Sequence, residues 1–557
     1  MTDQHALKGK NLFWIASIII VLLLAFHVIV STQITQYNAN DIGLLTKLPI
    51  TFWLGLSFLG ILLYFGRESR LRIAVVTVLI SFYLFGIPTL ISENKALFFG
   101  GVSEFYSSMG MQLLSKGYIQ FGTLYYLNWL NWPGFFILSG FLSKSASLPV
   151  TLFADYFTPL VMALLAIISY KILRLQLNAL SSSFGALWFV ASFWTGQQFF
   201  SSQGISYVIY FVIFLLLAKL FFVKKRNTVL PLAALVLFLG LITTHLLTSF
   251  ALTLGVVAVF AIYKILLRKH KIAPFYSIVT CILLLSIFIG YQAFVSQSFH
   301  GVIEVLYYEF SRGEAHTISV VSQSGIASSQ ALQMTQLGIY GITIINVIIA
   351  LIAITMTVTG ILIYKKEKVK NDLFWIAWII AAGMIGVFFF YGGEAINRAF
   401  VLMLLPTCYF AAYFFSKKPK ILIFVLIIIV FLSIPALYSN QNYMYISSTE
   451  MKGGAFFNRY VPFGVTFFCV PLSYLGPRTI NGTQLNIQQI AGYGSVPSSR
   501  IVEFVIAQSD FIISSNEQKN SFQYFYGVDL LQNLSLDYYN NRLYDNEGYQ
   551  TYGRFGG

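Results

Sequence analysis

Runs of about 20 apolar residues recur along the chain as far as residue 437, and they constrain its fold more than any other feature. A helix of that length crosses the hydrocarbon layer of a bilayer, which is roughly 30 Å thick. Hydrophobic residues make up 57% of the 557 residues and charged residues 10%, whereas soluble domains carry about a quarter charged residues. The sequence therefore predicts a polytopic α-helical protein of the plasma membrane.

The apolar runs predict about thirteen transmembrane helices. They lie at residues 13–31, 49–65, 73–92, 152–173, 184–200, 204–223, 229–245, 247–267, 274–295, 338–364, 373–391, 398–415 and 421–437. The first run is too long for the core of a signal peptide and lacks a cleavage site of small residues, so we expect it to be retained as a span. Two connections, 93–150 and 296–337, are much longer than the others.

Basic residues fall in short clusters between the apolar runs, and their positions predict the topology. The clusters are Lys8 and Lys10; Arg67, Arg70 and Arg72; Lys171 and Arg174; Lys224, Lys225 and Arg226; Arg268, Lys269 and Lys271; Lys365, Lys366, Lys368 and Lys370; and Lys417, Lys418 and Lys420. With a cytoplasmic N-terminus, thirteen crossings place every cluster on the cytoplasmic side, as the positive-inside rule requires. The C-terminus is then extracytoplasmic. The net charge of +15 forms no contiguous basic face with interleaved aromatics, which argues against a nucleic-acid partner.

The composition divides the chain into three regions. Residues 1–72 form an N-terminal extension of two spans, and residues 73–437 form the main transmembrane domain with both long outer connections. Residues 438–557 are rich in Asn, Gln, Ser and Tyr and predict a small extracytoplasmic domain, mixed α/β or β-rich. Within the first long connection, Trp132-Pro133-Gly134-Phe135 leads an apolar segment too short to span, so we expect it to lie in the outer membrane interface.

Polar residues that could support chemistry gather near the outer ends of the predicted spans. They are Glu93, Glu104, Trp132, Asp155, Gln203, Thr244-His245, Glu394 and Arg398. An arginine can bind a phosphate with two hydrogen bonds, and a carboxylate can deprotonate an attacking hydroxyl. Carboxylates beside a cationic residue at the boundary between water and lipid favour a reaction on a lipid-linked phosphate. No P-loop, dinucleotide glycine pattern, paired Cys-x-x-Cys or His-Glu-x-x-His accompanies them.

Each candidate also has a structural interpretation. Glu394 and Arg398 are four residues apart and could form an ion pair along one helix. His245 could hydrogen-bond at a helix end, and Asp155 could cap the start of its helix. His300 and His316 could bind a divalent cation with nearby Glu residues, although a solvated helix face is the more common role of such residues. The sequence thus predicts no definite metal site and leaves a divalent cation open.

The segments Gly101-Val102-Ser103-Glu104-Phe105-Tyr106, Gly117-Tyr118-Ile119 and Asn131-Trp132-Pro133-Gly134-Phe135 together resemble the first outer loop of GT-C glycosyltransferases. Relatives in that superfamily include protein O-mannosyltransferases and aminoarabinose transferases. The resemblance implies a polyprenyl-phosphate sugar donor, membrane lipid as a partner, and transfer to a protein or glycan acceptor on the extracytoplasmic face. The superfamily has long loops after its first and seventh core spans. If residues 73–92 are the first core span, residues 274–295 are the seventh and directly precede the second long connection.

The resemblance also implies roles for individual residues. Glu104 is the expected catalytic base, and Arg398 with His245 is expected to hold the donor phosphate. The remaining expected substrate-binding residues are Glu394, Gln203, Asp155 and Trp132. Ser103 stands where the superfamily has its catalytic Asp, so a non-catalytic scaffold on the cell surface is an alternative.

A transporter or flippase of a lipid-linked substrate is the other alternative. It predicts polar residues near the middle of the membrane, and the predicted spans are mostly apolar there. His27 is the chief exception, and we expect it to be buried and hydrogen-bonded.

Overall fold

In the computed structural model, most of residues 2–295 and 369–439 can be described, with gaps at 36–41, 67–68, 96–102, 118–130, 194–198, 224–228, 267–274 and 389–393 and at a few single positions. Isolated residues at 344–348 and 445–460 and five short strands of the tail are also described. The second long connection and nearly all of the predicted span 338–364 lie outside the described residues.

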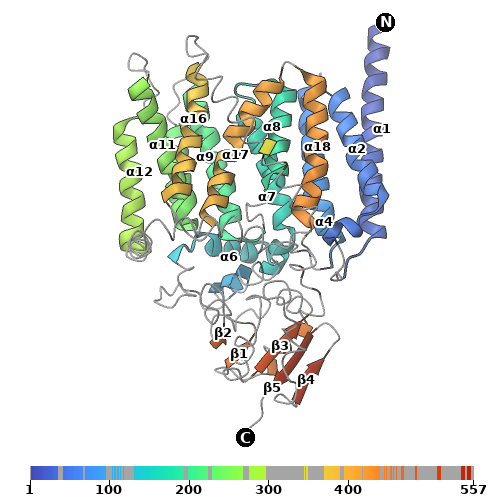
Figure 1. The fold of residues 1–557 in the computed structure, drawn as a ribbon, viewed down its shortest axis with the longest axis vertical. Coiled ribbons are helices and arrows are strands. Elements are labelled where there is room, and N and C mark those ends of the chain that lie inside the picture. Colours follow the sequence, from blue (N-terminus) through green and yellow to red (C-terminus); the bar gives the residue numbers. More distant parts are fainter. Residues whose placement is uncertain are drawn as a thin grey trace.

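The described part of residues 2–438 is a bundle of helices that run mostly side by side (Figure 1). Their bounds are α1 Thr2–Ser31, α2 Ile50–Phe65, α3 Arg70–Ser81, α4 Ile87–Ile91, α6 Gly134–Ala146, α7 Val150–Leu173, α8 Ala179–Ala191, α9 Ser202–Phe222, α10 Val229–Thr244, α11 Leu246–Leu266, α12 Ile278–Gly290, α16 Val369–Phe388, α17 Glu394–Phe415 and α18 Pro419–Tyr438. Single π-helical turns, Phe82–Gly86 and Tyr291–Val295, link α3 to α4 and extend α12.

Among the described residues, eight helical segments are long and apolar enough to cross a membrane, and four shorter helices are also apolar. Together they match every predicted span except 338–364, so the chain is a multi-pass membrane protein. One predicted boundary is wrong: the helix expected at 184–200 is Ala179–Ala191. Asn178 determines its start, because the side chain of Asn178 accepts a hydrogen bond from the backbone N–H of Ser181 at 2.8 Å.

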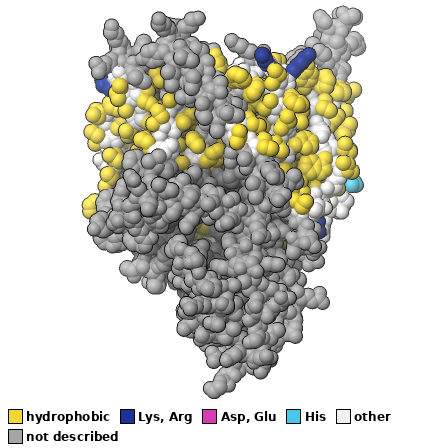
Figure 2. Space-filling view, viewed as in Figure 1, with side chains coloured by type: hydrophobic (Ala, Val, Ile, Leu, Met, Phe, Trp, Pro, Cys, Tyr) yellow, Lys and Arg dark blue, Asp and Glu magenta, His cyan; other side chains and the backbone are white. Residues whose placement is uncertain are grey.

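Large aromatic side chains fill the interior of the bundle. The ring of Phe214 on α9 lies 4.7 Å from that of Trp378 on α16, and Trp378 is almost fully buried. Gly255 on α11 lies directly against the same indole, where a Cβ would come within 1.9 Å of the ring. Small residues permit such close approach of helices in membrane proteins. Outward-facing side chains are apolar and form a belt around the bundle (Figure 2).

The two ends of the bundle differ in charge. Lysine and arginine side chains gather at the upper rim in Figure 2, where α3 and α18 begin. At the lower end, α6 crosses beneath the other helices (Figure 1). We call these the basic end and the α6 end.

A five-stranded sheet lies beyond the α6 end (Figure 1). Its strands are β1 Thr466–Phe468, β2 Thr483–Leu485, β3 Phe511–Ser515, β4 Asn541–Asp545 and β5 Tyr549–Gly553. They lie in the order β2-β1-β3-β5-β4, with β1 parallel to β2 and β3, and with β5 antiparallel to β3 and β4. The sheet is therefore mixed, and it lies in the region of the predicted tail domain.

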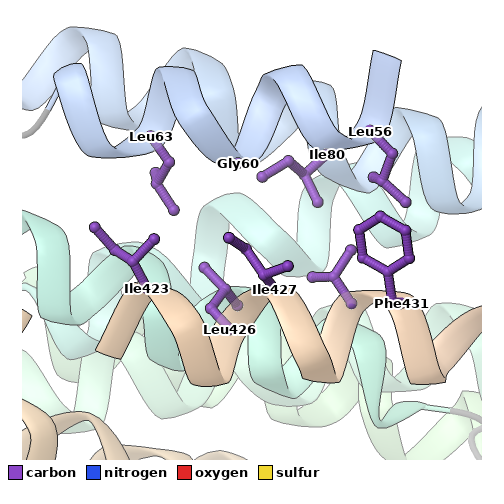
Figure 3. A pocket seen from close by; sticks show the side chains of 9 residues that line it. Leu56, Gly60, Leu63, Ile80, Ile423, Leu426, Ile427 and Phe431 are labelled. Carbon is purple, nitrogen blue, oxygen red and sulfur yellow. The ribbon is translucent and has the colours of Figure 1, made fainter. Parts of the chain in front are cut away.

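An apolar pocket lies between α2 and α18 (Figure 3). Leu56 and Leu63 line one wall, and Ile423 and Phe431 line the other. Its lining carries no polar side chain and thus offers no group for catalysis. Polar residues predicted to support chemistry, such as Gln203, His245 and Arg398, lie instead at the α6 end.

Candidate functional site

An aromatic cluster holds the α6 end together. It consists of Tyr106, Phe135, Phe136, Phe157 and Phe200. The ring of Tyr106 stacks on that of Phe136 with centroids 5.7 Å apart, and the rings of Phe135 and Phe200 lie 4.7 Å apart. The cluster thus joins the first outer connection to α6, α7 and the turn before α9. Aromatic pairs of this kind stabilise a fold by about 0.5–1.5 kcal/mol beyond the area they bury.

The length and the exposed apolar face of helix α6 suit a position at the membrane interface. It begins after Pro133 and ends at Ser147, which has a left-handed backbone with φ of 54°. One face, including Phe135 and Phe136, is buried, while Ile137 and Phe141 on the opposite face are 49% and 66% exposed. A helix of 13 residues that is apolar on its exposed face is too short to span but suits the membrane interface. This agrees with the interfacial position predicted from the sequence.

The start of α6 packs directly against the end of α10. A Cβ on Gly134 would lie 2.7 Å from Oγ1 of Thr244 and 2.8 Å from Oγ1 of Thr243, so only glycine fits there. Three residues before Gly134, the carbonyl of Asn131 accepts a hydrogen bond of 2.9 Å from the hydroxyl of Tyr291, directly after α12. These contacts position the segment around Trp132 against the α10–α11 turn.

His245 is the single residue between α10 and α11, and it caps α11. Its Nδ1 accepts a hydrogen bond from the backbone N–H of Thr248 at 3.4 Å and lies 3.3 Å from the Thr248 hydroxyl. The predicted role at a helix end is therefore confirmed. With Nδ1 as an acceptor, the neutral ring carries its proton on Nε2 and can donate one further hydrogen bond. Desolvation, and then the positive charge of Arg398, lower the pKa of His245 well below its usual value.

Arg398 lies in the first turns of α17, partly buried and close enough to His245 to act on its charge. A guanidinium and an imidazole are thus within electrostatic range of each other at the α6 end. Glu394 is the first residue of α17, but its side chain lies outside the described residues, so the predicted ion pair with Arg398 stays a prediction. Glu104 also lies outside the described residues, and its role as base stays a prediction.

Asp155 does not cap its helix, so that interpretation is wrong. Helix α7 begins at Val150 after Pro149, which places Asp155 in the second turn. Asp155 interacts electrostatically with Lys95. The ammonium of Lys95 also donates a hydrogen bond of 3.0 Å to the hydroxyl of Tyr156. Lys95 lies in the first outer connection, and no pattern in the sequence identified it as a partner of Asp155 or Tyr156.

Gln203, near the start of α9, is 2% exposed. Its Nε2 donates a hydrogen bond of 2.7 Å to the hydroxyl of Tyr207, one turn further along. Sequence reasoning missed Tyr207, although the spacing of four residues on a helix was the available signal. Trp132 is partly buried. Glu93 is exposed, and its backbone N–H donates a hydrogen bond to the backbone carbonyl of Ile34.

The described contacts thus connect Trp132 to His245 and Arg398, through Gly134 and Thr244. Asp155 and Gln203 reach the same end through α7 and α9, which share the aromatic cluster. Among the described residues, no group of three or more His, Cys, Asp and Glu side chains could hold a metal ion, and His300 and His316 lie outside them.

His27 on α1 is exposed on the apolar surface rather than buried, so that expectation is wrong. Its Nδ1 lies 3.4 Å from the hydroxyl of Thr51 on α2. The faces of α1 and α2 that bring these two residues together point toward lipid, so the pair offers no interior path for a transported substrate.

The sequence matches no protein-family profile and no curated protein. Among solved structures, the chain is similar to the oligosaccharyltransferase of Archaeoglobus fulgidus tethered to an acceptor peptide that contains the NVT sequon. The TM-score is 0.55 and the sequence identity 10%, over 88% of this chain and 75% of that one. A second structure of the enzyme, a complex with Zn and sulfate, aligns with a TM-score of 0.48 and 11% identity over 86% of this chain and 73% of that one. The alignment with the first of these structures shows that the chain shares the fold of an archaeal oligosaccharyltransferase.

Proposed function

We propose that the chain is a membrane glycosyltransferase that transfers a sugar from a polyprenyl-phosphate-linked donor to an acceptor on the extracytoplasmic face. The shared fold supports the general class. Support for the face comes from the positive-inside rule, because the candidate residues lie at the end opposite the basic rim. In this proposal the N-terminus is cytoplasmic, the protein lies in the plasma membrane, and residues 438–557 form the outer domain.

The observation that carries the proposal is the electrostatic interaction between Arg398 and His245 at the α6 end, where Thr244 packs against the start of α6. When the bond between the anomeric carbon and the phosphate oxygen breaks, the phosphate leaves with the electron pair and gains negative charge. A guanidinium and the Nε2–H of a neutral imidazole are suited to stabilise that charge, and preorganised donors of this kind are among the largest contributions to catalysis.

The attacking group of the acceptor forms the new bond to the anomeric carbon and loses a proton. In the proposal Glu104 takes this proton, and Glu394, Asp155, Gln203 and Trp132 contact substrate. Because the similar archaeal structure holds a peptide with the NVT sequon, such a peptide is the first acceptor to test, with glycans second. A divalent cation is tested in the same assay by adding a chelator.

The test is sugar transfer from a polyprenyl-phosphate-linked donor by the purified chain in liposomes. We expect Arg398→Ala to lower the rate by roughly 100-fold or more, because a donor to the developing charge is lost. We expect Glu104→Gln to lower it by about 100-fold, as the loss of a general base does. Arg72→Ala is the matched control, since it removes an arginine from the basic end. Undiminished transfer by both site variants would reject the proposed site.

A further inference from the structure

Several buried polar atoms at the α6 end lack a hydrogen-bond partner within the described structure, and three of them belong to residues close in sequence to members of the aromatic cluster. These three are Oγ of Ser103, Nε1 of Trp132 and Oε1 of Gln203. Ser103 and Gln203 are only 1% and 2% exposed. An unsatisfied buried polar group costs about 1–3 kcal/mol, and the large majority of such groups in proteins are paired. Three unpartnered buried polar atoms in residues next to one aromatic cluster require an explanation.

The residues that carry these three atoms are close in sequence to the aromatic cluster. Each lies three positions from a cluster member: Ser103 precedes Tyr106, Trp132 precedes Phe135, and Gln203 follows Phe200. Three residues of chain span at most about 10 Å. The ring of Phe135 contacts those of both Tyr106 and Phe200, so three separate segments each bring one of these polar residues to within three positions of one aromatic cluster.

The orientation of the Gln203 amide is fixed. Its Nε2 is held by the hydroxyl of Tyr207 at 2.7 Å, and the ring of Tyr207 packs edge-on against Phe193 with centroids 5.3 Å apart. The carbonyl oxygen therefore points away from Tyr207 and presents a fixed acceptor. Trp132 presents a donor, and the Ser103 hydroxyl can act in either sense.

We propose that Ser103, Trp132 and Gln203 form a subsite for a neutral polyhydroxylated ring, the sugar carried by the lipid-linked donor. This inference rests on the proposed function and specifies where the sugar binds. The three groups are uncharged and offer both donors and acceptors, which matches hydroxyl groups better than phosphate. The aromatic cluster beside them matches the apolar faces of a sugar ring, and the charged groups for phosphate, Arg398 and His245, lie across the Gly134 contact.

The test compares two probes on the full-length chain in detergent: a short-chain polyprenyl phosphate that carries glucose or mannose, and the same lipid phosphate without a sugar. Ser103→Ala, Trp132→Phe and Gln203→Leu each remove one of the orphaned atoms. We expect each to weaken binding of the sugar-bearing probe by about tenfold, without a change for the bare lipid phosphate. Trp14→Phe is the control, because it removes another unpartnered buried indole N–H at the basic end.

Ser103→Ala and Trp132→Phe change side-chain volume little, so they test the inference even where Gln203→Leu misfolds. Unchanged affinity for both probes in these two folded variants would overturn the inference and leave ordered water as the occupant. Equal affinity of the wild type for both probes would do the same. Failure of the wild type to bind either probe would instead refute the proposed function.

Discussion

The basic end and the α6 end each contain a tryptophan and a glutamine, but the hydrogen bonding of these side chains differs. At the basic end, Nε1 of Trp375 donates a hydrogen bond of 2.8 Å to Oε1 of Gln176. At the α6 end, Nε1 of Trp132 and Oε1 of Gln203 are both buried without a partner in the described structure. The Trp375–Gln176 pair is thus satisfied within the protein, whereas Trp132 and Gln203 each keep an unused hydrogen-bonding atom, which the proposed subsite assigns to a ligand.

This difference separates structural polar groups from functional ones. Two further hydrogen bonds lie at the basic end. The guanidinium of Arg174 donates one to the carbonyl of Leu177, and the hydroxyl of Tyr409 donates one of 3.2 Å to the carboxylate of Asp372. Such closed pairs stabilise a fold and leave little hydrogen-bonding capacity for a ligand. The comparison therefore predicts large effects on activity at the α6 end and effects on stability at the basic end.

The largest effect of the tests below is expected at Gly134. A Cβ in Gly134→Ala would meet both Thr243 and Thr244 within 2.8 Å, so the start of α6 must move away from His245. Misplacement of about 1 Å can cost 100-fold in rate, and we expect a loss of about 10- to 100-fold in sugar transfer. Gly240→Ala, on α10, has no atom within 4 Å of its new Cβ and is the matched control. Equal activity of the two variants would contradict the importance of this contact.

His245 allows capping to be separated from chemistry. His245→Asn keeps a side-chain acceptor for the Thr248 N–H but loses Nε2–H, so we expect the melting temperature to be retained and transfer to fall about tenfold. His245→Ala should also lose about 1 kcal/mol of stability. If His245→Asn transfers sugar at the wild-type rate, the imidazole acts only as a cap.

The lowered pKa of His245 gives a second test. The folded chain keeps the ring neutral while the unfolded chain binds a proton below its ordinary pKa of 6.5. Stability from this residue is therefore fully present above pH 6.5 and falls as the pH drops toward the lowered folded value. Thermal unfolding at about pH 7 and pH 5 should show a smaller loss for His245→Asn than for the wild type. An equal loss in both would contradict the assignment.

The smallest effect is expected at the basic end. Trp375→Phe leaves Oε1 of Gln176 without its partner, which should lower the free energy of unfolding by about 1 kcal/mol because Gln176 is only partly buried. Sugar transfer should stay within about twofold of the wild type, since a closed structural pair takes no part in binding. A loss of transfer without a loss of stability would break the comparison between the two ends.

The membrane bundle could be predicted from the sequence because lipid solvation imposes a simple length and polarity rule on each helix. The rule fails where side-chain bonds set a boundary, as at α8, whose start depends on the Asn178 cap. It also cannot show which face of a helix meets lipid, so His27 was expected to be buried.

The candidate site was harder to predict. Gln203, His245 and Arg398 were identified from their position near the ends of spans, and the structure places His245 and Arg398 together. The role of Gly134 could not be predicted, because it depends on how closely two distant segments approach. Likewise, no pattern in the sequence shows that the Gln203 carbonyl lacks a partner while its amide nitrogen has one.

The bond between Tyr291 and the carbonyl of Asn131 has one more consequence. It fastens the first outer connection to the last turn before the second one begins, across 160 positions of sequence. A substrate that displaces Trp132 must therefore either move the residues at the end of α12 or break this hydrogen bond. The position of Asn131 in the first outer connection is thereby coupled to the segment that ends α12.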